Sequence, residues 1–120
     1  QSQTQKDINV TNINVIRETF FHYYYRQHMA GNPHFPPSPI GGDHLMDEAW
    51  ANTPIDSTIS SLAPKDLFST DKVPLNSQNM PFYYETLYEL DQDGFMKHTI
   101  ILKDIDPDSP SYDLAFSYTI

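Results

Sequence analysis

The chain has 120 residues, of which 38% are hydrophobic and 13% aromatic, so it holds enough apolar side chain for one folded core and too much for a disordered chain. Seven basic residues against sixteen acidic ones give a net charge of −9, a field that repels phosphate backbones and anionic lipid headgroups. We therefore expect a single domain, residues 1–120, that binds neither nucleic acid nor a membrane surface, and that uses no disulfide or thiolate, because it lacks cysteine.

Residues 6–30 predict a long amphipathic helix. At 100° per residue its apolar side chains fall within one broad arc, with polar residues largely opposite. The arc contains Val10, Ile13, Ile16, Phe20, Phe21, Tyr23 and Tyr24. Gly31 suits the position after a helix end, and Asn32-Pro33 prevents continuation. The alternative is a strand over residues 20–25, because the aromatic run there is β-prone.

Residues 31–81 predict an irregular connector, because most of the ten prolines lie within it. Asp43 is placed to cap a short helix that runs through Trp50, and Asp56 or Ser57 to cap a second one through Leu62. Apolar residues in these short helices would pin the connector to the core.

Residues 82–120 predict a three-stranded antiparallel meander, with strands over 82–90, 95–105 and 112–120 separated by turn-forming clusters. Alternate residues share one face, for example Phe82, Tyr84, Thr86, Tyr88 and Leu90 in the first strand. Such a sheet needs a cover on its apolar side, and the aromatic stripe of the helix supplies one. The expected fold class is therefore α+β: a long N-terminal helix packed on a C-terminal antiparallel sheet.

Residues 12–38 contain Asn12–Arg17, the aromatic run Phe20–Tyr25, Gly31 and the aromatic-proline step Phe35–Ser38. In these residues, and beyond them in the order of the elements, the sequence resembles the soluble head of type IV pilin-like proteins, including the pseudopilins of type II secretion.

This resemblance implies a structural subunit of a pilus or pseudopilus-type filament, whose partners are like subunits. The family's apolar N-terminal helix, with a glutamate near the mature start, is not found in this sequence, so the resemblance implies a membrane anchor before Gln1 and an extracytoplasmic head. Many pilins also carry a C-terminal disulfide loop, which a chain without cysteine cannot form. A pseudopilin-like or minor subunit therefore fits better than an adhesive pilin.

Alternating acidic residues between the second and third predicted strands form a candidate calcium site, since carboxylate and hydroxyl oxygens suit this hard cation. The candidate ligands are Asp104, Asp106, Asp108 and Asp113, with Ser109 and Ser111 beside them. Some pseudopilins bind calcium near this end of the chain, which agrees with the hypothesis. The alternative is a solvated turn, because Asp, Pro and Ser favour turns and the EF-hand pattern is not satisfied.

Other patterns point to chemistry only weakly. His28, His34 and His44 would make a transition-metal site if the connector folded back on the helix end, but their spacing matches no metal motif. No nucleophile or paired-carboxylate motif is found, so we expect neither an enzyme nor a cofactor. Two alternatives to a filament subunit remain: a small acidic inhibitor or immunity-type module that binds a basic protein surface, and a structural domain of a virion or cell surface.

Overall fold

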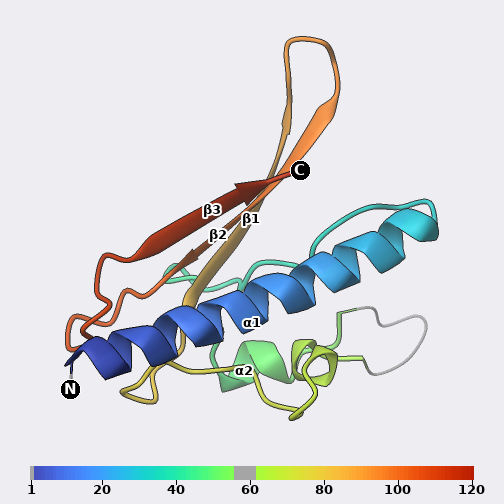
Figure 1. The fold of residues 1–120 in the computed structure, drawn as a ribbon. Helices are drawn as coiled ribbons and strands as arrows, with labels where there is room; N and C mark the ends of the chain where they lie inside the picture. Colours follow the sequence, from blue (N-terminus) through green and yellow to red (C-terminus); the bar gives the residue numbers. More distant parts are fainter. Residues whose placement is uncertain (1, 56–61) are drawn as a thin grey trace.

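The computed structural model describes residues 2–55 and 62–120, and its fold class is α+β, as the sequence predicts. A long helix, α1 (Ser2–Met29), lies along one side of the sheet (Figure 1). The connector carries a single-turn helix, α2 (Glu48–Ala51), and a 3-10 turn, η1 (Pro64–Leu67). The strands are β1 (Tyr83–Leu90), β2 (Met96–Lys103) and β3 (Ala115–Thr119).

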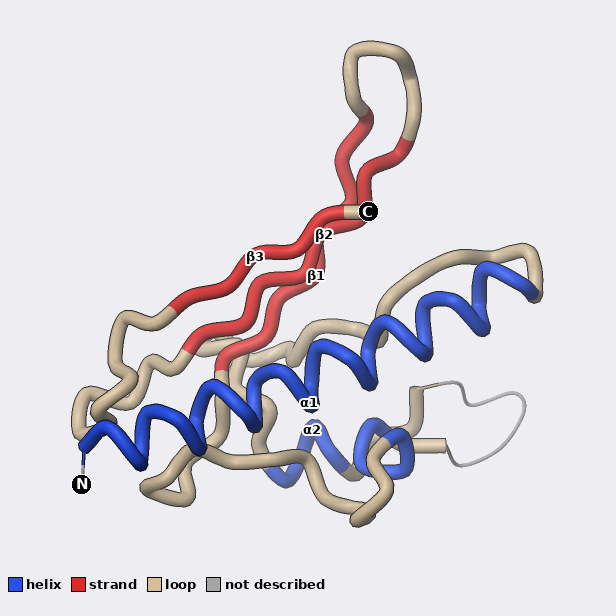
Figure 2. The backbone as a smooth tube through the Cα atoms, in the orientation of Figure 1, coloured by secondary structure: helices blue, strands red, loops and turns tan. Residues whose placement is uncertain are grey.

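The sheet is an antiparallel meander in the order β1-β2-β3, which confirms the predicted topology (Figure 2). Tyr84 lies opposite Leu102 in the first pair of strands, and Ile100 lies opposite Tyr118 in the second. The predicted turn between β1 and β2 is closed by Asp91, whose side-chain Oδ1 accepts the backbone N–H groups of Asp93 and Phe95, each at 2.9 Å.

Helix α1 starts four positions before the predicted Lys6 and ends at Met29, so the alternative of a strand over residues 20–25 was wrong. Gly31 ends the helix at φ 92°, a left-handed conformation that glycine adopts without strain. The N–H of Asn32 donates to the carbonyl of Gln27 at 2.9 Å, and the N–H of Gly31 to that of His28 at 3.0 Å, which is the Schellman pattern. None of the helices within residues 2–55 and 62–120 combines the length and apolar character needed to cross a bilayer.

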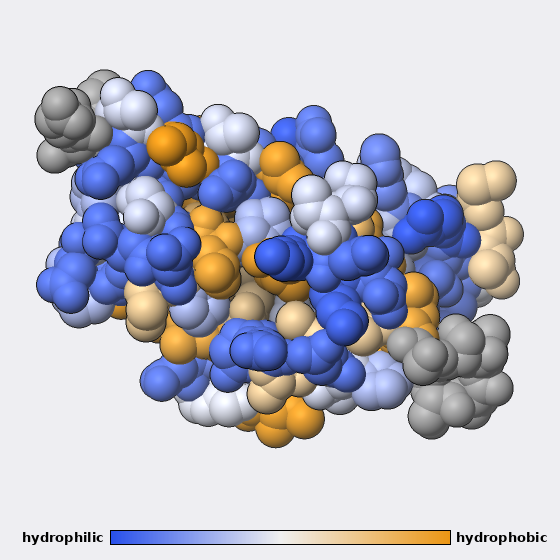
Figure 3. All heavy atoms as spheres, turned by 90° about the horizontal axis from the view of Figure 1, so that it is seen from below, coloured by the Kyte–Doolittle hydropathy of each residue, from blue (hydrophilic) through white to orange (hydrophobic). Residues whose placement is uncertain are grey.

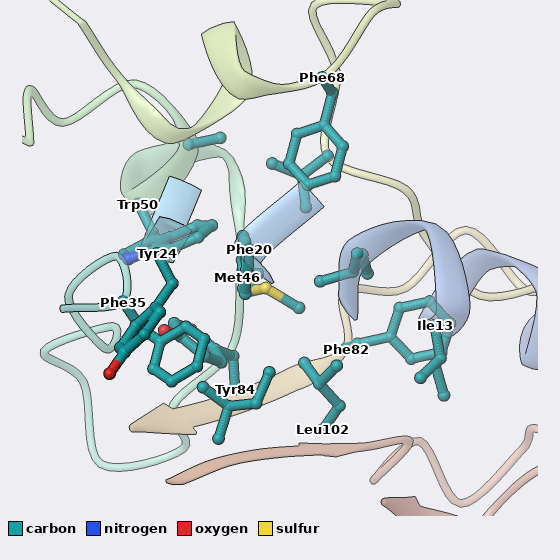
Figure 4. Close-up of a cluster of buried hydrophobic side chains, with 14 residues drawn as sticks. Ile13, Phe20, Tyr24, Phe35, Met46, Trp50, Phe68, Phe82, Tyr84 and Leu102 are labelled. Carbon is teal, nitrogen blue, oxygen red and sulfur yellow. The ribbon is translucent and has the colours of Figure 1, made fainter. Parts of the chain in front are cut away.

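The core lies between the buried face of α1, the inner face of the sheet and the connector (Figure 4). Phe20 is fully buried at its centre, and its ring centroid lies 4.6 Å from that of Tyr84 and 6.3 Å from that of Trp50. Tyr84 is also fully buried, and its O–H donates to the carbonyl of Pro36 at 2.5 Å. The aromatic stripe of the helix therefore covers the sheet, as its periodicity predicts.

The connector differs from the prediction in its first short helix. Asp47, and not Asp43, caps α2, because its Oδ1 accepts the N–H of Trp50 at 2.9 Å. The residues before it instead run beside β1: the N–H of Met46 donates to the carbonyl of Phe82 at 2.9 Å, and the N–H of Tyr84 donates to that of His44. Because these residues pair with the edge of the sheet, the helix begins later in the sequence than predicted. The predicted helix from Asp56 or Ser57 through Leu62 lies, except for Leu62 itself, outside the described part of the chain.

The third strand is shorter than predicted, since it begins at Ala115 and not at Tyr112. Residues 109–114 form successive turns, in which the N–H of Tyr112 donates to the carbonyl of Ser109 at 3.1 Å and that of Leu114 to the carbonyl of Ser111 at 2.9 Å. The helix covers less of the first strand than predicted. Tyr88 and Leu90 are 43% and 68% exposed, because the distal half of the β1–β2 hairpin extends away from α1 (Figures 1 and 2).

Candidate functional site

The turn after β2 is built around Asp104, a carboxylate with no exposed surface. Its Oδ2 accepts the hydroxyl of Ser109 at 2.5 Å, and its Oδ1 accepts the side-chain amide of Asn76 at 3.1 Å and the backbone N–H of Asp106 at 3.2 Å. These hydrogen bonds replace the ones that water would make to the carboxylate, as a buried charged group requires.

Asn9 of α1 joins the same network from the opposite side and is itself fully buried. Its side-chain amide donates to the hydroxyl oxygens of Ser111 at 2.9 Å and Ser109 at 3.2 Å. Its carbonyl oxygen accepts the backbone N–H of Ser77 at 2.7 Å. The network therefore ties the helix, the connector and the β2–β3 turn together at one end of the sheet.

The four aspartates predicted as calcium ligands occupy different environments. Asp106 is half-buried and shares the Asn76 amide with Asp104, at 3.1 Å from its Oδ2. Asp108 is exposed, and its contact with Asp106 runs through its own backbone N–H. Asp113 is exposed at a left-handed φ of 75°. Among the described residues, no group of three or more His, Cys, Asp or Glu side chains is arranged to hold a metal ion. Hydrogen bonds from Asn76 and Ser109 to Asp104 favour the alternative of a turn without a metal. Thermal melts in calcium and in a chelator decide between the two.

The histidines near the helix end make local contacts instead of converging. The Nε2 of His34 lies 3.1 Å from the hydroxyl of Tyr23, and the Nδ1 of His44 lies 3.1 Å from the carbonyl of Pro39. His28 is exposed in the last turn of α1. His34 thus joins the start of the connector to the helix, and His44 makes its contact within the connector.

Sequence reasoning missed Asn9 and Asn76, which hold this network together. The position of Asn9 could have indicated the network, because Asn9 lies on the buried side of α1 with Ile13 and Ile16. A buried amide needs hydrogen-bond partners. Asn76 gives none: it lies in the connector and meets Asp104 only through the tertiary fold.

Another buried polar residue, His98 of β2, lies apart from this network. It is 8% exposed, and its ring lies edge-on to those of Tyr24 and Tyr88. Its Nδ1 is buried and has no hydrogen-bond partner among the described residues. Burial lowers the pKa of His98 below its ordinary value, and the nearby His34 lowers it further. Folding therefore favours the neutral imidazole.

The exposed side of α1 carries apolar residues as well as polar ones. Ile8, Val15 and Met29 are 46%, 42% and 87% exposed, and they stand at spacings of 7 and 14 positions. Residues seven apart lie close to one line along a helix. We call these three residues the outer helix face; all three lie outside the buried stripe of α1.

The connector lines a pocket of about 380 Å³, partly open to solvent, between residues 37–45, α2 and the prolines Pro54 and Pro64. Trp50 forms part of its wall, and the indole N–H donates to the carbonyl of Pro37 at 3.0 Å, so this polar atom already has a partner. Seen from below, the molecule is mostly hydrophilic, and apolar residues form separate spots there and no continuous patch (Figure 3).

No protein-family model matches this sequence, and neither the curated proteins nor the solved structures contain a significant match.

Proposed function

We propose that this chain is the head of a structural subunit in a type IV pilin-like filament, closest in character to a pseudopilin, and that its work is assembly. Two things support the proposal: the resemblance within residues 12–38, and a fold in which one long N-terminal helix precedes an antiparallel sheet. Its partners are further copies of the same or a similar subunit.

The outer helix face is the observation that carries the proposal. One side of α1 is buried against the sheet, whereas Ile8, Val15 and Met29 are exposed. Apolar residues at heptad spacing are found on helices that pack against other helices. His22 occupies the heptad position between Val15 and Met29, so the apolar line is interrupted there. In a filament, this face would meet the helices of neighbouring subunits.

The proposal places the head outside the cytoplasm and requires an apolar anchor encoded before Gln1. The net charge of −9 then belongs to a surface that faces other subunits and solvent, where it orients the head against basic patches of its neighbours.

Sequencing the gene upstream of the Gln1 codon tests the proposal. An apolar run of about 20 residues, preceded by a short basic leader, is the expected result, because that length crosses a bilayer as a helix. A start codon there, or an ordinary cleavable signal, would end the proposal and favour an acidic module that binds a basic protein.

A further inference from the structure

The pocket between residues 37–45, α2 and the prolines Pro54 and Pro64 has the size of a small-molecule site. We call it the connector pocket. Its volume of about 380 Å³ lies within the range of about 300–1,000 Å³ that is common for ligand pockets. Apolar side chains form much of its wall, among them Pro37, Pro39, Ile40, Leu45 and Trp50. A ligand with an apolar body would therefore bury that body here.

Hydrogen bonds hold the wall of this pocket in place. The N–H of Tyr84 in β1 donates to the carbonyl of His44 at 2.9 Å, and the N–H of His44 donates to that of Gly41 at 3.0 Å. The indole N–H of Trp50 donates to the carbonyl of Pro37 at 3.0 Å, which joins α2 to the opposite wall. A wall that is already positioned loses less entropy on binding than one that must first form.

The charged groups that line the connector pocket are both acidic. They are Asp43 and Asp47, and neither Lys nor Arg is found among the described residues of the wall. Lys65 follows Pro64 in the chain but does not line the pocket, and Glu48 stands beside Asp47 in the sequence. The pocket therefore carries negative charge, in a chain whose net charge is −9, and it favours a cation.

Most side-chain donors of the wall are already used. The indole N–H of Trp50 and the hydroxyl of Thr53 each have a carbonyl partner. The Nδ1 of His44 lies 3.1 Å from the carbonyl of Pro39, which can only accept, so Nδ1 carries the proton and the Nε2 of the neutral ring is left as an acceptor. The hydroxyl proton of Ser38 is the one side-chain donor of the described wall without a partner.

The carboxylates of the wall, in contrast, have free oxygens. The Oδ1 of Asp47 accepts the N–H of Trp50 at 2.9 Å. Its Oδ2 and both oxygens of Asp43 accept no hydrogen bond from the residues that the structure describes. The pocket thus offers several acceptors and little to donate, so a ligand that fits it must supply the donors.

We propose that the connector pocket binds an organic cation, namely an ammonium or guanidinium group carried on an apolar body. The body lies against the prolines and Trp50, and the N–H groups of the cation donate to Asp43 and Asp47. A free amine has this chemistry, and so does a lysine or arginine side chain of another chain. The inference goes beyond the proposed function and does not rest on it, because it uses no residue of the outer helix face.

Trp50 makes this binding measurable, because it lines the pocket and is the only tryptophan in the chain. Titration with phenethylamine should change the tryptophan fluorescence along a saturable curve. The matched ligand is 2-phenylethanol, which has the same aromatic body and no charge. We expect phenethylamine to bind several-fold more tightly than the alcohol. Sodium chloride should weaken the binding of the amine, because salt screens its attraction to the carboxylates.

The double variant Asp43→Asn, Asp47→Asn should lose the preference for the amine, because it removes both charges while asparagine still caps α2. The matched control is Asp93→Asn, Asp108→Asn, which removes two charges at exposed positions that do not line the pocket and should leave the titration unchanged. Ala49→Leu adds bulk at a lining position, so it should weaken the amine and the alcohol alike.

The blocked dipeptide N-acetyl-phenylalanyl-lysine amide separates the two sources of the cation. If it binds more tightly than phenethylamine, the ligand is a side chain of another chain; if it binds more weakly, the ligand is a free amine. Equal affinities for phenethylamine and 2-phenylethanol, an unsaturable titration, or wild-type binding by the double variant Asp43→Asn, Asp47→Asn would overturn the proposal. None of these results bears on the proposed function, which depends on the gene upstream of Gln1.

Discussion

Asn9 and Ser111 are joined by a hydrogen bond of 2.9 Å from side-chain amide to hydroxyl, although 102 positions separate them in the sequence. Both residues are almost fully buried. This bond and its neighbours fasten the first half of α1 to the β2–β3 turn, at the end of the sheet opposite the hairpin tip (Figure 1).

Replacing Asn9 by leucine should lower the free energy of unfolding by about 1–3 kcal/mol, because buried donors and acceptors lose their partners. The midpoint of urea denaturation measures the loss. Asn14→Leu on the same helix is the control, since Asn14 is only half-buried. Equal midpoints for the wild type and Asn9→Leu would show that the network adds nothing to stability.

Replacing Phe20 by alanine should cost about 3–5 kcal/mol, the usual loss for a large buried aromatic side chain. Its ring packs on those of Trp50, Phe68 and Tyr84. Phe95→Ala is the matched control, because Phe95 is 71% exposed and should change stability by about 0.5 kcal/mol or less. Similar denaturation midpoints for the two variants would contradict the packing of α1 on the sheet.

His98 should make the protein less stable as the pH falls. Burial lowers its pKa in the folded state, whereas in the unfolded chain it titrates near about 6.5. The unfolded state therefore binds the proton first, so stability is complete above that pH and declines as the pH falls through the lower folded pKa. His98→Gln should remove this part of the decline in denaturation curves measured between pH 8 and 5. His28→Gln, at an exposed site, should keep it, and identical pH profiles for His98→Gln and the wild type would exclude His98 as the cause.

Calcium should leave the melting temperature unchanged, because the oxygens of Asp104 already accept hydrogen bonds from Asn76 and Ser109. Thermal melts in calcium and in a chelator provide the measurement. A melting temperature that rises with calcium concentration would instead establish the site that the alternating aspartates predict, since a ligand that binds only the folded state stabilises it.

Local signals in the sequence were enough to predict the helix and the order of the strands. The apolar period of α1 and the stop at Gly31 depend on residues close together, and so does the turn at Asp91. The start of α2 was misplaced because residues 44–46 pair with the edge of β1, a contact between distant segments that no local pattern reveals.

The candidate surfaces were harder to predict than the fold. The alternation of β1 indicated a covered face through Leu90, but the distal half of the hairpin leads away from α1 (Figure 1), and this leaves Leu90 exposed. The cluster of acidic residues was visible in the sequence. That Asp104 is buried and bonded to Asn76 follows only from the tertiary fold.

Filament recovery from cells that encode this protein, with the complete gene, tests the central claim most directly. The account predicts that the wild-type chain enters the sheared or extracted filaments. The double variant Ile8→Asp, Val15→Asp should accumulate as a folded protein but be left out, because both positions are exposed and charge opposes the packing of apolar helix faces. A wild-type chain found only as a free monomer, or a double variant that assembles as well as the wild type, would contradict a filament subunit that assembles through its outer helix face.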